Sequence, residues 1–268
     1  MNKIKISILC PTRQRMSHMR RLAESAFDTC YDRNQVEIVF GIDDDDHESI
    51  EVAKELQKQY SPENIVYTTW PRRKYIFSDL INQVAYVAKG EIFNLVGDDA
   101  VYITKGWDRL IVEQYALIPD GIALVHVQDG ITGEVARDLV CHPFMHRNWL
   151  DAVGYLLPPI FNGDWADWWI TRVAAIIDAI CKSRHTRAHP RKVYRPDILI
   201  QHMHIESGLA DPDKTYYEHL EERRADTEIP DKDHPYHSVS SAIQREQDVF
   251  KLLNFLENFY REKYAKSK

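Results

Sequence analysis

The sequence predicts an α/β protein: a mostly parallel sheet covered by helices on both faces, with a C-terminal helical extension. Short apolar runs rich in β-branched residues alternate with segments whose apolar residues recur at helical spacing, which is typical of strand–helix–strand units. The apolar runs stop at polar or acidic turns. With 268 residues, 44% of them hydrophobic, the chain is long enough to bury one large core.

Strands are expected where an apolar run stops at a turn residue or an acidic group. They are predicted at residues 4–10, 36–42, 65–69, 91–96, 122–127, 139–146 and 197–204. The first run stops at Pro11, the second at the acidic run 43–46, and the fourth at the sequence GDDA. Each of the early strands therefore ends in residues that can bind a ligand.

Helices are expected between these strands, where apolar residues share one helical face. They are predicted at residues 17–30, 48–60, 77–88, 107–115, a short one from 148, 167–181, and 238 to the end. In the first of them Met19, Leu22 and Ala26 have the required spacing. The final helix carries Leu253, Leu256 and neighbouring apolar residues every 3.6 positions, so we expect it to be amphipathic.

Composition excludes several classes of protein. The chain has 34 Lys and Arg against 41 Asp and Glu, a net charge of −7, which argues against binding nucleic acid through bulk charge. Its four cysteines lie far apart with no CxxC pair, so we expect no zinc knuckle, no disulfide framework and a reducing, cytoplasmic compartment. No stretch approaches the roughly 20 apolar residues of a membrane span, and no membrane partner is expected.

Ligands of open parallel sheets bind at the carboxyl ends of the strands, so the residues that follow each strand are considered together. These residues are Pro11, Thr12 and Arg13 after the first strand, Asp43 and Asp44 after the second, and Asp98 and Asp99 after the fourth. Arginines and carboxylates at one edge suit a nucleoside diphosphate with a divalent cation. Neither GxGxxG nor a P-loop occurs. Acidic pairs at strand ends are also ordinary turn formers, so on the residues alone both interpretations stand.

The stretch NQVAYVAKGEIFNLVGDDAVYITKGWDRL resembles the donor-site segment of GT-A glycosyltransferases, family 2 above all. Asn82 stands where the family has an asparagine in the preceding helix, and Asp98 and Asp99 fall on its DxD-type motif, with Gly97 in place of the initial aspartate. ISILCPTRQR is similar to the family's first strand and nucleotide loop, and FGIDDDD to its acidic second strand end. The resemblance covers roughly the first 115 residues.

This resemblance implies a GT-A (Rossmann-like) fold and a nucleotide-sugar donor, a UDP-sugar. Residues 1–115 would bind the donor, 116–210 would form the acceptor and catalytic half of the same domain, and 211–268 a C-terminal loop and amphipathic helix. Asp99 would bind Mn²⁺ or Mg²⁺, Asp98 would face the ribose or sugar, and Asp43 or Asp44 the nucleoside. Arg72 and Arg73 either reach the diphosphate or belong to a solvated loop.

The stretch LVCHPFMHRNWLDAVGYLLPPIFNGDWADWWI looks like the acceptor half of such enzymes, in a pattern similar to phage-encoded members. An inverting transfer needs a carboxylate that takes the proton of the acceptor. Asp167 is the preferred base and Asp164 the alternate. The two aspartates can equally well be an acidic cap at the start of a helix. A late histidine completes the metal shell in many GT-A enzymes. His204 is the first choice and His202 the second, the alternative being that both are buried core histidines.

A basic segment, residues 182–192, stands out in this acidic chain. Its cations are Lys182, Arg184, Arg187, Arg191 and Lys192. Either it binds nucleic-acid phosphates beside the acceptor site, or it is a solvated loop. The first case, with the phage-like pattern, implies a hydroxymethylated base in DNA as acceptor and the host cytoplasm as location.

The sequence therefore predicts a metal-dependent glycosyltransferase, a hexosyl- or pentosyltransferase, that inverts the anomeric centre and uses a hydroxyl acceptor. A saccharide acceptor is the alternative to DNA. A nucleotidyltransferase would share the acidic metal site, and a non-catalytic module that binds sugar nucleotides would share the fold. The oligomeric state has no signal in the sequence.

Overall fold

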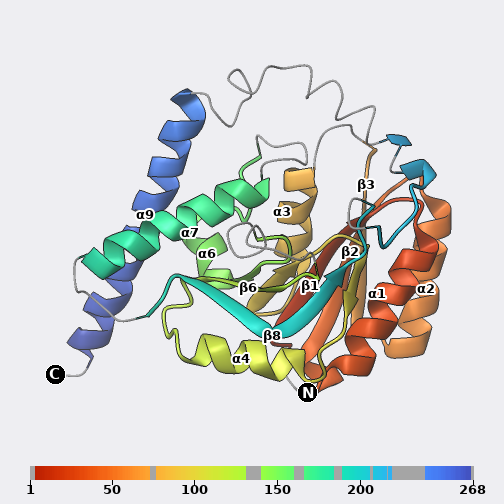
Figure 1. Ribbon diagram of the computed structural model, residues 1–268, viewed down its shortest axis with the longest axis horizontal. Coiled ribbons are helices and arrows are strands. Elements are labelled where there is room, and N and C mark those ends of the chain that lie inside the picture. The colour runs from red at the N-terminus through yellow and green to blue at the C-terminus, as the bar shows by residue number, and fades with distance from the viewer. Residues whose placement is uncertain are drawn as a thin grey trace.

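The computed structural model of the protein describes residues 4–72, 77–130, 140–159, 166–183, 189–205, 208–215, 217–218 and 239–266. These residues build an eight-stranded sheet with helices on both faces (Figure 1). The predicted α/β class, the mostly parallel sheet and the C-terminal helix are confirmed.

The strands are β1 (Ile6–Thr12), β2 (Val36–Asp43), β3 (Ile65–Trp70), β4 (Ile92–Leu95), β5 (Ala100–Tyr102), β6 (Leu124–Gln128), β7 (Phe144–His146) and β8 (Lys192–His202). Three differ from expectation. Strand β5 was not predicted, because three residues are too few to show a period. Strand β7 begins at Phe144, later than the expected residue 139. Strand β8 begins at Lys192, earlier than the expected Asp197, because residues 192–195 also pair with β6, on the other side of a shift in register.

The strand order is β3-β2-β1-β4-β7-β6-β8-β5. Strands β3, β2, β1 and β4 all run parallel, so their carboxyl ends meet at one edge of the sheet. Strand β7 is antiparallel to both β4 and β6, and β5 is antiparallel to β8. The sheet is therefore continuous from the expected donor half into the expected acceptor half.

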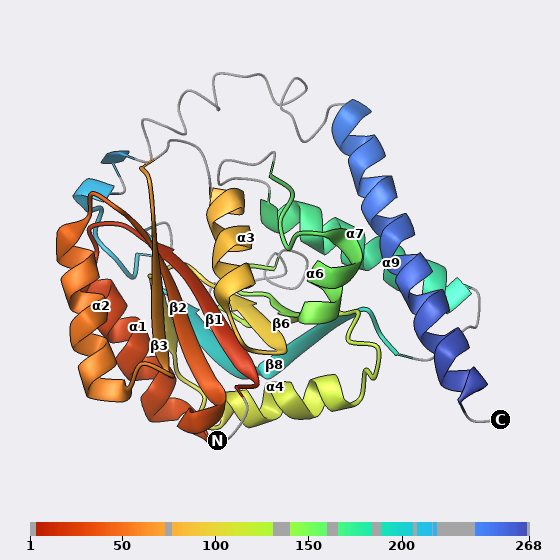
Figure 2. The same cartoon turned by 180° about the vertical axis from the view of Figure 1, so that it is seen from behind.

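The helices are α1 (Met16–Thr29), η1 (Arg33–Gln35), α2 (His47–Tyr60), α3 (Phe77–Val87), α4 (Trp107–Ala116), α6 (Arg147–Val153), α7 (Ala166–Ser183) and α9 (Val239–Ala265). Side chains alternate between the faces of β1, so Ile6 and Ile8 share one core cluster with α1, α2 and α4. Leu9 belongs to the other cluster, with α3, α6 and α7. Figure 2 shows this second side of the sheet.

Helix α9 packs on α6 and α7, far from α1 and α2 (Figures 1 and 2). Its buried residues Leu252, Leu256 and Tyr260 follow the predicted amphipathic spacing. The Tyr260 hydroxyl donates to Asp120 Oδ2 at 2.7 Å, which ties the helix to the centre of the molecule. Among the helices that the described residues form, none is long and apolar enough to cross a membrane.

Candidate active site

The loop after β1 is fixed by two carboxylates from other elements. Thr12 Oγ1 donates to Asp98 Oδ2 at 2.7 Å, and the Gln14 backbone N–H donates to Asp46 Oδ2 at 2.6 Å. Gln14 has a left-handed backbone (φ 54°), so this loop turns sharply back toward the sheet edge. Pro11 lies inside β1, paired in register with Gly41, and only its partly exposed ring faces the site.

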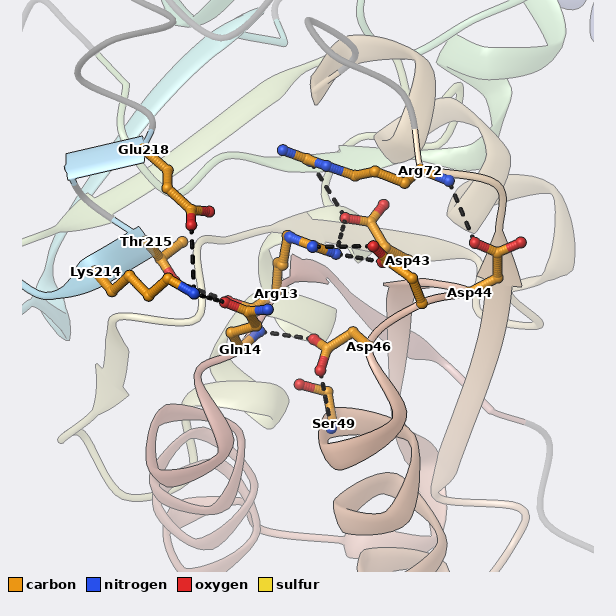
Figure 3. Close-up of polar contacts among 11 residues, drawn as sticks. Arg13, Gln14, Asp43, Asp44, Asp46, Ser49, Arg72, Lys214, Thr215 and Glu218 are labelled. Carbon is orange, nitrogen blue, oxygen red and sulfur yellow. Dashed lines mark hydrogen bonds and ion pairs between the residues drawn. The ribbon is translucent and has the colours of Figure 1, made fainter.

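A cluster of arginines and aspartates lies at the ends of β2 and β3 (Figure 3). Arg13 Nη1 lies 3.0 Å and Arg72 Nη1 3.3 Å from Asp43 Oδ2, while the Arg72 backbone N–H donates to Asp44 Oδ1 at 3.3 Å. Burial raises the pKa of the Asp43 carboxyl above its ordinary value, although Arg72 and Arg13 oppose the shift. The predicted residues Arg13, Asp43, Asp44 and Arg72 are thus brought together, and Arg73 lies outside the described residues.

The two adjacent aspartates after β4 point to different partners. Asp98 is 5% exposed and accepts hydrogen bonds from Thr12 and from Arg15 Nη1, the latter at 3.0 Å. Asp99 Oδ2 lies 3.2 Å from His202 Nε2. Asp98 therefore contacts the end of β1 and the loop after it, whereas Asp99 contacts the end of β8. The two residues lie in the turn between β4 and β5, in which the Ala100 N–H donates to the Gly97 carbonyl at 3.2 Å.

Gly97 explains how this chain departs from a three-aspartate motif. A Cβ atom at position 97 would lie 2.6 Å from Asp99 Oδ1, which is closer than real Cβ contacts allow. Since Gly97 has no side chain, the Asp99 carboxylate can lie back over the backbone of the turn. The glycine thus sets where the carboxylate lies.

Three histidines gather around Asp99. The His202 ring centroid lies 5.0 Å from that of His142 and 4.9 Å from that of His204. Burial raises the pKa of Asp99, but the hydrogen bond and charge of His202 outweigh it and lower the pKa to about 2. Burial also lowers the pKa of His142 to about 3. His142 was not predicted, because nothing in its local sequence places it beside a strand 60 residues away.

The pair of Asp99 and His202 fits a divalent cation. Adjacent ligands of an octahedral ion bound at about 2.1 Å lie about 3 Å apart, close to the 3.2 Å measured here. Within the described ranges no three His, Cys, Asp or Glu side chains converge on a point that could hold a metal ion. A cation at this pair would therefore take its other ligands from bound phosphate and water. The contact favours His202 over His204 as the partner of Asp99, the reverse of the order expected from the sequence.

Asp167 lies in the first turn of α7, half-buried, and its Oδ1 accepts the Trp168 N–H at 2.8 Å. The charges of Asp167 and Asp99 both act on the thiol of Cys141. Burial raises the pKa of the Cys141 thiol, and the charges of Asp129, Asp167 and Asp99 raise it further. Asp167 and Asp99 therefore both lie within electrostatic range of one thiol. Asp164 lies outside the described residues.

The tryptophans near Asp167 have different roles. Trp169 is buried in the core, and its Nε1 donates to Asp248 Oδ2 at 3.1 Å. Trp168 is 44% exposed beside Asp167. Only Trp168 of these two is placed to stack on a ligand.

Asn82 lies apart from the acidic cluster. Its Oδ1 accepts the backbone N–H groups of Leu156 and Leu157 at 2.9 and 3.1 Å, and its Nδ2 donates to the Leu157 carbonyl at 2.7 Å. The side chain is buried, and both its amide oxygen and its amide nitrogen form hydrogen bonds. Its observed role is to join α3 to the segment that follows α6.

One cation of the basic segment, Arg191, is buried and does not contribute to a cationic surface. Arg191 is 1% exposed and forms an ion pair with Asp120, and its Nη1 also donates to the Ile122 carbonyl at 2.9 Å. Lys182 pairs with Asp178 on the same helix. Arg184 and Arg187 lie outside the described residues. Arg191 is therefore unavailable to a nucleic-acid phosphate, which corrects the role expected for it.

Two further residues complete the site. Arg15 Nε and Nη2 donate to the two Asp213 carboxylate oxygens at 2.8 and 3.0 Å, so Arg15 joins Asp98 to a segment almost 200 positions further along the chain. Arg15 follows the first predicted strand in the sequence, and the sequence assigns it no role. Asp213 carries no local signal that could have assigned it to the site.

No protein-family profile matches this sequence, and no curated protein matches it. Solved structures do match. S. aureus TarS aligns with a TM-score of 0.57 at 12% identity, over 74% of this chain and 36% of the TarS chain. A mannosyltransferase from Pyrobaculum calidifontis, PcManGT, in complex with GDP-Man and Mn²⁺, aligns with a TM-score of 0.56 at 15% identity, over 96% of this chain and 75% of its own. TarS 1–349 in complex with UDP-GlcNAc aligns with a TM-score of 0.54 at 14% identity, over 96% and 73%.

This chain thus spans little more than a third of the TarS chain that it matches. At these identities the likeness concerns the arrangement of the backbone. The order of the sheet, the helices on its two faces and the alignment over nearly the whole chain lead to one conclusion: this chain has the GT-A glycosyltransferase fold.

Proposed function

We propose that the protein is a metal-dependent glycosyltransferase that moves a sugar from a nucleotide sugar, a UDP-sugar, to a hydroxyl acceptor with inversion. The observation that carries the proposal is the meeting of Asp43, Asp98 and Asp99 with Arg13 and Arg15 at one edge of the sheet. The structures of TarS with UDP-GlcNAc and of PcManGT with GDP-Man support a nucleotide sugar as donor, since both share this fold.

The donor would lie across the ends of β1, β2 and β4. Asp43, the last residue of β2, would accept hydrogen bonds from the nucleoside, and Asp44 lies beside it. Arg13 and Arg72 already neutralise Asp43, and both guanidinium groups can turn toward a diphosphate. Arg73 is proposed for the same role, and Asp98 for the ribose or the sugar.

Asp99 and His202 would hold Mn²⁺ or Mg²⁺, with His204 as the next candidate. When bound, the ion offsets the negative charge that develops on the departing nucleoside diphosphate. Asp99 suits this position because its lowered pKa keeps the carboxylate ionised at neutral pH.

Asp167 is the proposed general base, with Asp164 as the alternate. The acceptor oxygen attacks the anomeric carbon from the face opposite the diphosphate, and its proton passes to the carboxylate as the bond from carbon to phosphate oxygen breaks. Trp168 beside Asp167 offers an exposed ring on which an acceptor sugar can stack.

A saccharide is the first acceptor to test, because Trp168 offers an exposed ring while Arg191 is buried against Asp120. A hydroxymethylated base in DNA is the second acceptor to test. Its support is confined to the phage-like sequence pattern and the remaining cations of residues 182–192.

One experiment tests the whole proposal: incubation with a panel of UDP- and GDP-sugars and Mn²⁺, with free nucleoside diphosphate and transferred sugar measured together. The proposal requires diphosphate release that depends on Mn²⁺ and is stimulated by an acceptor. Release of sugar 1-phosphate, with a nucleoside monophosphate joined to the acceptor, would identify a nucleotidyltransferase instead. Tight UDP binding with no turnover on any acceptor would identify a non-catalytic module.

A further inference from the structure

Three consecutive side chains of the segment 208–215 contact the loop after β1, residues 13–15, which we call the nucleotide loop. Asp213 binds the Arg15 guanidinium with both carboxylate oxygens, at 2.8 and 3.0 Å. Lys214 Nζ donates to Gln14 Oε1 at 3.4 Å, and Thr215 Oγ1 donates to the Arg13 carbonyl at 3.1 Å (Figure 3). These contacts place an acidic side chain from a distant part of the chain directly in the proposed donor site.

Arg15 is the cation to which Asp213 binds. A third N–H, on Nη1, donates to Asp98 Oδ1 at 3.0 Å, so a single guanidinium bridges the carboxylate of the proposed donor motif and that of the segment. Two parallel N–H donors are the geometry that arginine also offers to phosphate. The Asp213 side chain is 35% exposed, against 18% for Arg15, so the carboxylate rather than the arginine lies on the solvent side of the pair.

Two carboxylates already surround Arg15, and a diphosphate would add further negative charge at the same point. The two anions compete for the same face of the guanidinium, because the Nε–H and the adjacent Nη2–H cannot form a bidentate pair with a carboxylate and with a phosphate at once. A diphosphate that binds Arg15 through this bidentate face must therefore displace Asp213.

Resting on the proposed function, we propose that Arg15 is a diphosphate-binding residue and that Asp213 holds its guanidinium until the donor replaces it. Asp213 is then an internal competitor that lowers affinity for nucleoside diphosphates. Displacement of Asp213 loosens one of the three contacts through which the segment 208–215 lies on the nucleotide loop.

The test is calorimetric titration of the full chain with UDP and with GDP, each with Mn²⁺. We expect Asp213→Asn to lower the Kd of the bound nucleotide about threefold to tenfold, because the amide keeps the size but not the charge of the competitor. Asp211→Asn is the matched control: it removes the same charge from an exposed position in the segment and leaves the Kd unchanged. In an Arg15→Gln background, Asp213→Asn has no effect on the Kd.

The outcomes separate this inference from the proposed function. An unchanged or raised Kd in Asp213→Asn, with wild-type binding intact, overturns the competition and shows that Asp213 supports Arg15. Absence of UDP and GDP binding in the wild-type protein overturns the proposed function itself. Asp213→Ser, melted alongside Asp213→Asn and the wild-type chain, checks the fold, and a tighter Kd in this second variant supports the inference independently.

Discussion

The carboxylate of Asp99 occupies the space that a side chain at Gly97 would need, since a Cβ atom there would lie 2.6 Å from Asp99 Oδ1. Gly97 stands where the family that the sequence resembles has the first aspartate of its motif. In this chain the glycine leaves room for the Asp99 carboxylate in its observed position.

Gly97→Ala should therefore displace Asp99 without unfolding the protein, because position 97 does not need a left-handed backbone. We expect UDP affinity measured with Mn²⁺ to fall about tenfold or more, as for other changes that move a metal ligand. UDP affinity measured without a metal serves as the control. An equal loss in both titrations would show that Gly97 supports the nucleotide loop instead of Asp99.

His202→Ala should weaken Mn²⁺ binding more than His204→Ala, because His202 Nε2 lies 3.2 Å from the Asp99 carboxylate. Loss of one of two protein ligands costs about tenfold to a hundredfold in metal affinity. Mn²⁺ titration followed by electron paramagnetic resonance measures both variants. A larger loss in the His204 variant would restore the order expected from the sequence.

Asp167→Asn should abolish sugar transfer and leave UDP and Mn²⁺ binding intact, because the amide cannot accept the acceptor proton. The expected decrease in kcat is about 10²-fold to 10⁴-fold, the usual contribution of a general base. Turnover and the Kd for UDP are measured on the same preparation. If Asp164→Asn loses turnover and Asp167→Asn keeps it, the base is Asp164.

Asp120→Ala should destabilise the fold, because it leaves the buried guanidinium of Arg191 without its carboxylate. Breaking a buried ion pair from one side costs about 3–5 kcal/mol. Tyr260→Phe removes only the hydroxyl hydrogen bond to the same carboxylate and should cost about 1 kcal/mol. Urea denaturation measures both, and equal losses would show that Arg191 finds another partner.

Stability should fall as the pH drops below about 6.5, the ordinary pKa of histidine. Burial lowers the pKa of His146, whose Nδ1 accepts the Asn148 N–H at 3.1 Å at the start of α6, so the folded state binds fewer protons there than the unfolded state. Stability is therefore gained as pH rises through this range and lost as it falls. His146→Asn keeps a capping oxygen and should flatten the dependence of Tm on pH between 7 and 5. An unchanged slope would exclude His146 as its source.

The central strands could be predicted from the sequence because β1 and β2 are buried on both faces, and such strands appear as continuous apolar runs. The acidic cluster followed from them, since Asp43 and Asp98 come directly after strands whose carboxyl ends meet at one edge. Strand β5 could not be predicted, because its three residues are defined by pairing with β8, about a hundred positions away.

The rest of the site depends on contacts that have no local signal. Asp213 reaches Arg15 from the far end of the chain, and His142 reaches His202 across the sheet. The role expected for Arg191 was wrong for the same reason. A run of basic residues suggests a solvent-exposed surface, and nothing in the local sequence shows that Arg191 packs against the buried Asp120.

Strand β7 lies antiparallel between β4 and β6 and hydrogen-bonds to both. The first half of the chain and the part that follows α4 therefore share one continuous ladder, and a rotation of one against the other would break its hydrogen bonds. Asp99 and Asp167 lie outside this ladder, in a turn and in the first turn of α7, so a change in their spacing would need movement of the turn or the helix and would leave the strand pairing intact.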